Sequence, residues 1–323
     1  MADVRLTQLF TNIANAIRNK KGSVGIIKAA DFPAEIESIE VGGSAPRWTG
    51  HADVEGLKAI GWDDADIAYY QQYGVDWNEE EDEYHKVSDD NKALYGVLTA
   101  NNIQTYRDRV VYLPKIDTSA VTNFTSMFNR CVNMVAIPMI DTSNAQSFME
   151  LFNRCYSLSC VPILDASKVT NATDMFYNCY ALQYVPEIYM QQVVATRLFQ
   201  SCYSLMENRI KLTAPNNVSQ LYHSCYALKR VVYPSDWGNV SSSSSEFALC
   251  YNLEWLKIKK LNKSIDLSTS HAFKKESLLY IIENEAAANS ISIKLETSAY
   301  TRLSADADIQ AALAAHPNIS LAK

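Results

Sequence analysis

The sequence reads DTSAVTNFTSMFNRCVNMVAIPMI from Asp117 to Ile140, DTSNAQSFMELFNRCYSLSCVPIL from Asp141 to Leu164, and DASKVTNATDMFYNCYALQYVPEI from Asp165 to Ile188. These are three consecutive units of equal length. Degenerate units follow, anchored by LFQSCYSL (198–205), LYHSCYAL (221–228) and FALCYNL (247–253), and AFKKESL (272–278) resembles a seventh with Lys275 in the cysteine position. Self-similarity at a fixed period is typical of repeat architectures. The chain is therefore predicted to be an α/β solenoid, in which coils bury their apolar edges against one another.

Six cysteines mark the period of this solenoid. They recur at nearly constant intervals, and Cys160 stands outside their column: Cys131, Cys155, Cys179, Cys202, Cys225 and Cys250. Apolar or aromatic residues lie three before, three after and, in most units, six after each cysteine. This pattern predicts a helical turn around the cysteine and a short strand in each coil, all in one parallel sheet. The column thiols are predicted to be buried and inert, and no CxxC cluster suggests a metal site.

The DTS start of the repeats has two interpretations. Asp117, Asp141 and Asp165 each lie two residues before a serine, so their carboxylates can accept hydrogen bonds from backbone N–H groups of a turn. Stacked acidic turns could also bind calcium, but no glycine-rich acidic nonapeptide accompanies them. The turn interpretation is favoured, and no cofactor or metal is expected.

Composition excludes several classes of function. The net charge of −7 and the pI of about 5.3 argue against nucleic-acid binding, which usually leaves a basic footprint. No run of 18 apolar residues is present, so no membrane insertion is expected. The first residues, MADVRL, lack the pattern of a secretory signal.

The repeats resemble the BspA-like branch of leucine-rich repeats, whose units run close to DTSNVTNMSYMFxxCxxLxxVPxL. The resemblance covers about Val110 to Ile282 and is closest in the first three units. It implies leucine-rich repeats of roughly 23–25 residues that serve adhesion rather than catalysis. Members of this branch occur on bacterial surfaces, in protist surface proteins and in phage virions.

The two ends of the chain divide it further. Residues 1–43 are predicted to be a helical leader, with helices over 6–19 and 32–39, and they resemble the leader of phage and prophage tail-associated proteins through IANAIR (13–18) and DFP (31–33). Residues 44–100 are predicted to be an acidic, aromatic cap that closes the N-terminal edge of the solenoid. It includes a helix capped by Asp63 or Asp64 and the acidic run 79–83, interpreted as a solvated face or loop. The solenoid is placed at 101–282.

Residues 283–323 are predicted to form a C-terminal cap, with strands at 291–296 and 319–322 and a helix starting near Ala305. Catalysis is not expected. The five histidines show no HxxxH or HExxH spacing, and there is no GxSxG elbow. Glycosidase activity through a pair of carboxylates is not excluded by the sequence, because such a pair is defined by its distance in space and not by its spacing along the chain.

Two surfaces are candidates for binding. The residue five positions after each cysteine is predicted to face outward from its strand, and so is the residue two positions further, which is Lys257 in the sixth unit. Together they give a stripe of aromatic and cationic residues suited to binding sugars or proteins: Tyr184, Arg230, Trp255, Lys257 and Tyr280. The residue after the cysteine is tyrosine in five coils, at Tyr156, Tyr180, Tyr203, Tyr226 and Tyr251. That column could bind a ligand, but half-buried packing is favoured.

The sequence thus predicts a non-enzymatic binding protein. The preferred hypothesis is a phage or prophage virion component that recognises a host-surface glycan or protein and joins other virion proteins through residues 1–43. The alternative is a BspA-like adhesin at the bacterial cell surface, and the third is a cytoplasmic scaffold or a glycan-degrading enzyme built on the solenoid. A homo-oligomer is compatible with the repeats, although no sustained heptads specify one.

Overall fold

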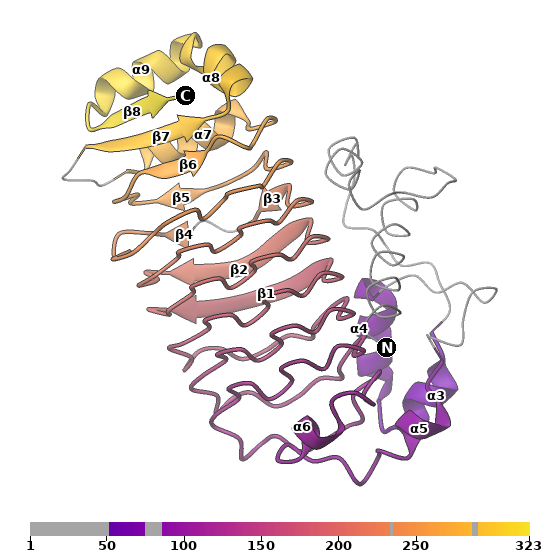
Figure 1. The fold of residues 1–323 in the computed structure, drawn as a ribbon. Helices are drawn as coiled ribbons and strands as arrows, with labels where there is room; N and C mark the ends of the chain where they lie inside the picture. Colours follow the sequence, from indigo (N-terminus) through magenta and orange to yellow (C-terminus); the bar gives the residue numbers. More distant parts are fainter. Residues whose placement is uncertain (1–51, 75–85, 233–234, 286–289) are drawn as a thin grey trace, which may run out of the picture.

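The computed structural model describes residues 52–74, 86–232, 235–285 and 290–323. The leader expected over residues 1–43 and the acidic run 79–83 lie outside these ranges. Within them, parallel sheets and short helices are arranged along a stack of coils (Figure 1).

Successive coils lie side by side in parallel. A column of single backbone bridges pairs each of its residues with the counterpart in the next coil: Asn123, Ser147, Asn171, Val194, Asn217 and Ser242. Each of these residues lies eight positions before a cysteine of the column, so the bridges repeat with the period of the cysteines. A second column begins with Tyr112 and Ala136 and includes Cys160 and Tyr184. Each coil is thus held to the next by backbone pairing at two places.

The second column widens into regular strands in the later coils. One parallel sheet contains β1 (Tyr184–Gln191), β2 (Glu207–Thr213), β3 (Arg230–Val231), β4 (Ser235–Asp236) and β5 (Ile258–Lys259). A second parallel sheet contains β6 (Ile265–Leu267), β7 (Ile291–Leu295) and β8 (Ile319–Ala322). The prediction of a single sheet was wrong, because the strands of the C-terminal unit pair with β6 rather than with β5.

A compact turn precedes each cysteine where the sequence predicted a turn of helix. Residues five and one before the cysteine have positive φ, and in the third coil these are Asp174 (58°) and Asn178 (62°). Alternate N–H groups therefore donate to the following coil, as Phe176 does to the Leu198 carbonyl at 2.9 Å. A regular helix would keep these hydrogen bonds within its own segment. Stacking selects this geometry although each left-handed residue costs about 1–2 kcal/mol.

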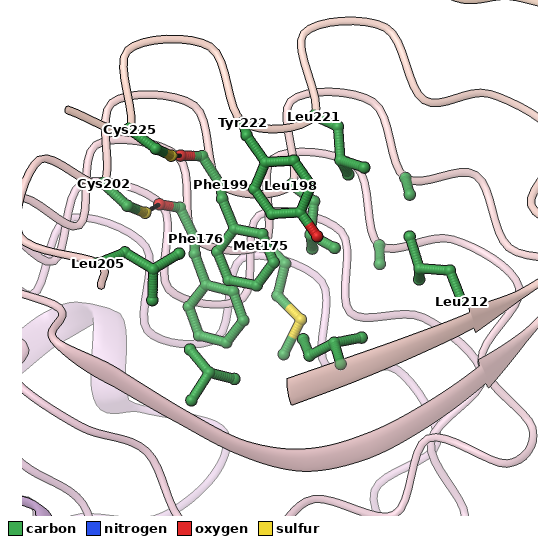
Figure 2. Packing of buried hydrophobic residues seen from close by; sticks show 14 of the residues in the cluster. Met175, Phe176, Leu198, Phe199, Cys202, Leu205, Leu212, Leu221, Tyr222 and Cys225 are labelled. Carbon is green, nitrogen blue, oxygen red and sulfur yellow. Dashed lines mark hydrogen bonds between the residues drawn. The ribbon is translucent and has the colours of Figure 1, made fainter. Parts of the chain in front are cut away.

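The interior consists of columns of like side chains (Figure 2). Three residues before each cysteine lies a buried aromatic ring, and the Phe176 and Phe199 centroids are 5.2 Å apart with planes 4° from parallel. The cysteines form the adjacent column and are fully buried. From Cys155 onward, each Sγ of the column donates to the carbonyl of an aromatic residue in the preceding coil, as Cys202 does to Phe176 at 3.1 Å. The predicted burial of the column cysteines is confirmed.

The thiols lead to a labelling prediction. Burial raises the pKa of the Cys131 and Cys160 thiols to about 12, so almost no reactive thiolate is present near neutral pH. We expect none of the seven cysteines to react with dithionitrobenzoate within minutes at mildly alkaline pH, and all of them to react after unfolding in guanidinium chloride. Absorbance of the released chromophore measures both. Rapid reaction of the native chain would contradict the burial of the column.

One polar pair interrupts the apolar columns. Asn208 occupies the buried position held by Val185 and Val231 in neighbouring coils, and Tyr222 stands in the column of phenylalanines. The Asn208 amide donates to the Tyr222 hydroxyl at 2.8 Å, and its Oδ1 accepts from the Ile210 N–H at 3.1 Å. The two departures from the repeat therefore satisfy each other's polar groups.

The DTS motifs form the turns that the sequence predicted. The carboxylates of Asp117, Asp141 and Asp165 each accept from the backbone N–H two residues later at 2.9 Å. The residues two positions later are Ser119, Ser143 and Ser167, and their hydrogen bonds lower the pKa of the three aspartates. The motif therefore fixes the corner of its own coil.

Within residues 52–74 and 86–106, four short helices precede the regular coils: α3 (Val54–Ala59), α4 (Asp64–Tyr73), α5 (Asp89–Lys92) and α6 (Ile103–Tyr106). Asp63 caps α4 in a capping box with Asp66, and Gly74 ends it, as the sequence indicated. The Gln104 side-chain nitrogen in α6 lies 2.9–3.1 Å from three carbonyl oxygens of the first coil, those of Ser126, Met127 and Asn129. The Met127 and Asn129 carbonyls hold the positions that accept from the preceding coil elsewhere in the stack, so Gln104 closes this edge.

Helix α4 lies against the outward side of the second column. Ile67 and Tyr70 join the hydrophobic cluster that contains Ala136 and Cys160. The buried Asp66 carboxylate accepts from the Met139 N–H and from the Lys115 ammonium, each at 2.6 Å. The expected cap at the N-terminal edge is therefore only part of the role of this region. Its helix also covers a sheet face, because small outward residues there leave room for apolar side chains.

The C-terminal part contains α7 (Lys275–Glu283), α8 (Thr297–Ser304) and α9 (Ala307–Ala315) around β7 and β8. The two strands and the helix α9 agree with the sequence prediction, whereas α8 was not predicted. The seventh coil was predicted wrongly, because Lys275 begins a helix instead of taking the cysteine position. Leu278, Ile281 and Ile282 recur at helical spacing and are buried by that helix.

Candidate binding face on the first sheet

The outward side of the first sheet collects most of the predicted site residues. Tyr184, Glu207, Arg230 and Trp255 are paired in parallel register across four coils, so they form one row. Lys257 is exposed two residues after Trp255. The row follows the direction of stacking and crosses β1, β2 and β3 in Figure 1.

Tyr280 reaches this row from a helix rather than from a strand. It lies in α7, and the Lys257 ammonium nitrogen is 5.2 Å from the centroid of its ring. The strand position predicted for Tyr280 was therefore wrong. Its side chain nevertheless borders the row, because α7 packs beside β5.

Tyr184 is covered by α4. The Tyr73 ring stacks on it with centroids 4.2 Å apart and planes 8° from parallel, and Tyr184 is only 9% exposed. Burial raises the pKa of Tyr184 to about 12. The prediction that Tyr184 belongs to an exposed stripe was wrong, and the exposed ring of the face in this coil is Tyr189.

Cations lie over aromatic rings along the whole face. Four such pairs have nitrogen or guanidinium carbon 5.2–5.9 Å from a ring centroid: Arg209 over Tyr184, Lys211 over Tyr189, Arg230 over Trp255, and Lys257 over Tyr280. A cation–π contact restricts the side chain and leaves its charge in place. The rings therefore hold a set of ordered positive charges.

Carboxylates neutralise only part of this charge. Glu207 accepts from Arg209 at 2.7 Å, and Asp236 pairs with Lys260 at 2.7 Å. Within the described ranges, no ion pair involves four outward cations of the face: Lys211, Arg230, Lys257 and Lys259. The face is thus cationic on a chain whose net charge is −7.

Sequence reasoning placed Arg209 at the same outward strand position as Lys257, seven residues after the cysteine, but missed Lys211, Tyr189 and Lys259 as members of the face. The signal was present in β2, where burial alternates residue by residue, so that Glu207, Arg209 and Lys211 all point outward. Lys211, Tyr189 and Lys259 lie nine or ten residues after their cysteines, so a search at the offsets of five and seven does not find them.

The tyrosine column forms a second surface feature. Neighbouring rings from Tyr156 to Tyr226 stack with centroids 4.8–4.9 Å apart. Tyr251 and His271 continue the series at 5.8 and 6.3 Å. Because the faces of these half-buried rings cover one another, they are not free to stack on a ligand. The geometry favours the packing interpretation.

Residues 101–211 match a family model described as Mycoplasma protein of unknown function, DUF285. The matched segment covers the first coils and ends within β2. No curated protein and no solved structure matches the chain. The likeness relates the coils to a family without a described activity.

Candidate metal ligands do not gather in the described part of the chain. No cluster there of three or more histidine, cysteine, aspartate or glutamate side chains could hold a metal ion. Among the described residues, no helix has the length and apolar character needed to cross a membrane. His223 contacts the Ser224 hydroxyl at 2.9 Å, and desolvation lowers its pKa. The cationic face therefore remains the best candidate site.

Proposed function

We propose that this chain is a non-enzymatic binding protein, built as a solenoid of BspA-like leucine-rich repeats, that engages its ligand through the outward face of the first sheet. The observation that carries the proposal is the row of Arg230, Trp255 and Lys257, in which ring-bound cations lie exposed across adjacent coils. Aromatic and arginine side chains are the residues that most often dominate binding energy at such surfaces. The parallel pairing of coils supports the repeat class.

Within this class, we propose a phage or prophage virion component, such as a tail fibre, baseplate or capsid-decoration protein. It would recognise a host-surface glycan or protein through the sheet face and join other virion proteins through residues 1–43. The resemblance of that leader to tail-associated proteins supports this assignment. The alternative is an adhesin at the bacterial cell surface. Mass spectrometry of purified virions tests the first, and surface labelling of intact cells tests the second.

The sheet face predicts a specific loss of binding. Trp255→Ala removes a ring at the centre of the row, and we expect binding on a glycan array or to cell-wall preparations to weaken at least ~30-fold, as for a central hot spot of about 2 kcal/mol or more. Tyr300→Ala is the matched control, because Lys323 lies 5.3 Å over that ring away from the face. If both variants bind like the parent chain, the sheet face is not the binding surface.

A further inference from the structure

We infer that the ligand of the sheet face is an anionic polysaccharide whose carboxylate, sulfate or phosphate groups are bound by its outward cations, Lys211, Arg230, Lys257 and Lys259. The inference rests on the proposed binding function of this face and adds the chemical class of the ligand.

The cations come from neighbouring coils and point the same way. Lys211 lies on β2 and Arg230 on β3, each next to a buried residue that faces the core. Lys257 and Lys259 flank the buried Ile258 on β5 and are exposed. Positive charge is thus repeated along the stack rather than gathered at one point. A repeated row suits a repeating polymer that runs along the coils.

The charge of the face differs in sign from that of the chain. Two acids lie opposite cations of the face in strand register, Glu207 opposite Arg230 and Asp236 opposite Lys259. Their carboxylates are already bound by Arg209 and Lys260. The outward cations of the face that take no part in an ion pair among the described residues attract a polyanion locally. Such a field directs the polymer to the sheet face.

Rings beside the cations favour a saccharide backbone. Trp255, Tyr189 and Tyr280 each carry a cation of the face over the ring, so an apolar surface adjoins a charged donor. A sugar unit with an acidic group needs both, because its C–H face packs on a ring while its anion accepts a charge-assisted hydrogen bond. Nucleic acid also offers anions and stacking, and polyuridylate is therefore included in the test as the competing ligand class.

The test uses the full chain, three anionic polysaccharides and one neutral match. Polygalacturonate and its methyl ester share one backbone and differ in charge, and chondroitin sulfate and a phosphate-bearing capsular polysaccharide supply sulfate and phosphate. In biolayer interferometry we expect at least one of the three polyanions to bind. Where it is polygalacturonate, the ester should bind at least ~10-fold more weakly, and added salt should weaken polyanion binding.

Variants then assign the binding to the face. Lys257→Gln/Lys259→Gln should weaken polyanion binding at least ~10-fold, since two charge-assisted contacts are lost. Lys168→Gln/Lys323→Gln is the control, because it removes the same charge from two exposed lysines outside the sheet face. The control should change binding less than about twofold. Circular dichroism confirms that both double variants fold.

Each other outcome overturns the inference. Binding to none of the polyanions, equal binding to the acid and its ester, or equal loss in both double variants would each do so. Tighter binding to polyuridylate than to any glycan would indicate a nucleic-acid ligand instead. If the chain binds a neutral glycan and Trp255→Ala abolishes that binding, the inference about an anionic ligand is wrong, while the proposed binding function still holds. The proposed function fails if Trp255→Ala leaves all binding unchanged.

Discussion

Replacing Phe176 with alanine is expected to lower the free energy of unfolding by about 3–5 kcal/mol. Its ring is fully buried and stacks on Phe152 at 5.4 Å and on Phe199 at 5.2 Å. Truncation leaves a cavity between two rings, and the backbone pairing of coils on either side keeps that cavity from closing. Guanidinium chloride denaturation followed by circular dichroism measures the loss.

The control for this variant is Tyr189→Ala, which truncates an aromatic ring that is 51% exposed. It should cost less than about 1 kcal/mol, because the ring lies at the surface and its loss opens no cavity in the core. Since each coil contacts only its neighbours, Phe176→Ala should also decouple the coils before it from those after it and broaden the transition. Equal costs for the two variants would contradict the aromatic column as the core of the stack.

Replacing Asp66 with alanine should release α4 from the sheet. The carboxylate is buried and accepts from the Met139 N–H and the Lys115 ammonium. Breaking a buried ion pair costs several kcal/mol, but Lys115 is one-third exposed and can be rehydrated, so we expect about 2–3 kcal/mol. Because Cys160 lies in the cluster beneath α4, release should make this thiol alone reactive. Iodoacetamide labelling followed by peptide mass spectrometry identifies it.

Asp64→Ala is the matched control on the same helix. The Asp64 side chain is 88% exposed and pairs with Lys58 at the surface. Exposed pairs contribute little, so this variant should leave Cys160 protected and stability within about 0.5 kcal/mol. A Cys160 that stays unreactive in Asp66→Ala would show that α4 is held by its apolar contacts alone.

The periodic part of the fold could be predicted from the sequence because its determinants recur. The cysteine spacing equals the spacing of the backbone bridges, and the aromatic position three residues earlier is buried in every coil from Phe128 to Phe247. The DTS turns were predictable because an aspartate binds a backbone N–H only two residues away. Interactions within one repeat unit can be inferred from the sequence of that unit, and the same residues in the next unit support the inference.

Contacts between distant segments could not be predicted in this way. Nothing near Tyr184 in the sequence reveals that Tyr73, more than a hundred residues earlier, covers its ring. The left-handed residues before each cysteine are mostly polar or charged and none is glycine. Residue type alone therefore did not predict their positive φ. Their conformation follows from hydrogen bonding to the next coil, which is a property of the stack.

The most direct test of the central claim is amide hydrogen exchange at single-residue resolution on the full chain. Asp174 and Asn178 donate their N–H groups only to carbonyls of the following coil, those of Thr196 and Gln200. We expect these two amides to exchange as slowly as that of the buried Phe176, because all three open only when coils separate. Exchange of Asp174 and Asn178 at the rate of solvent-exposed turns would contradict a stack held together from coil to coil.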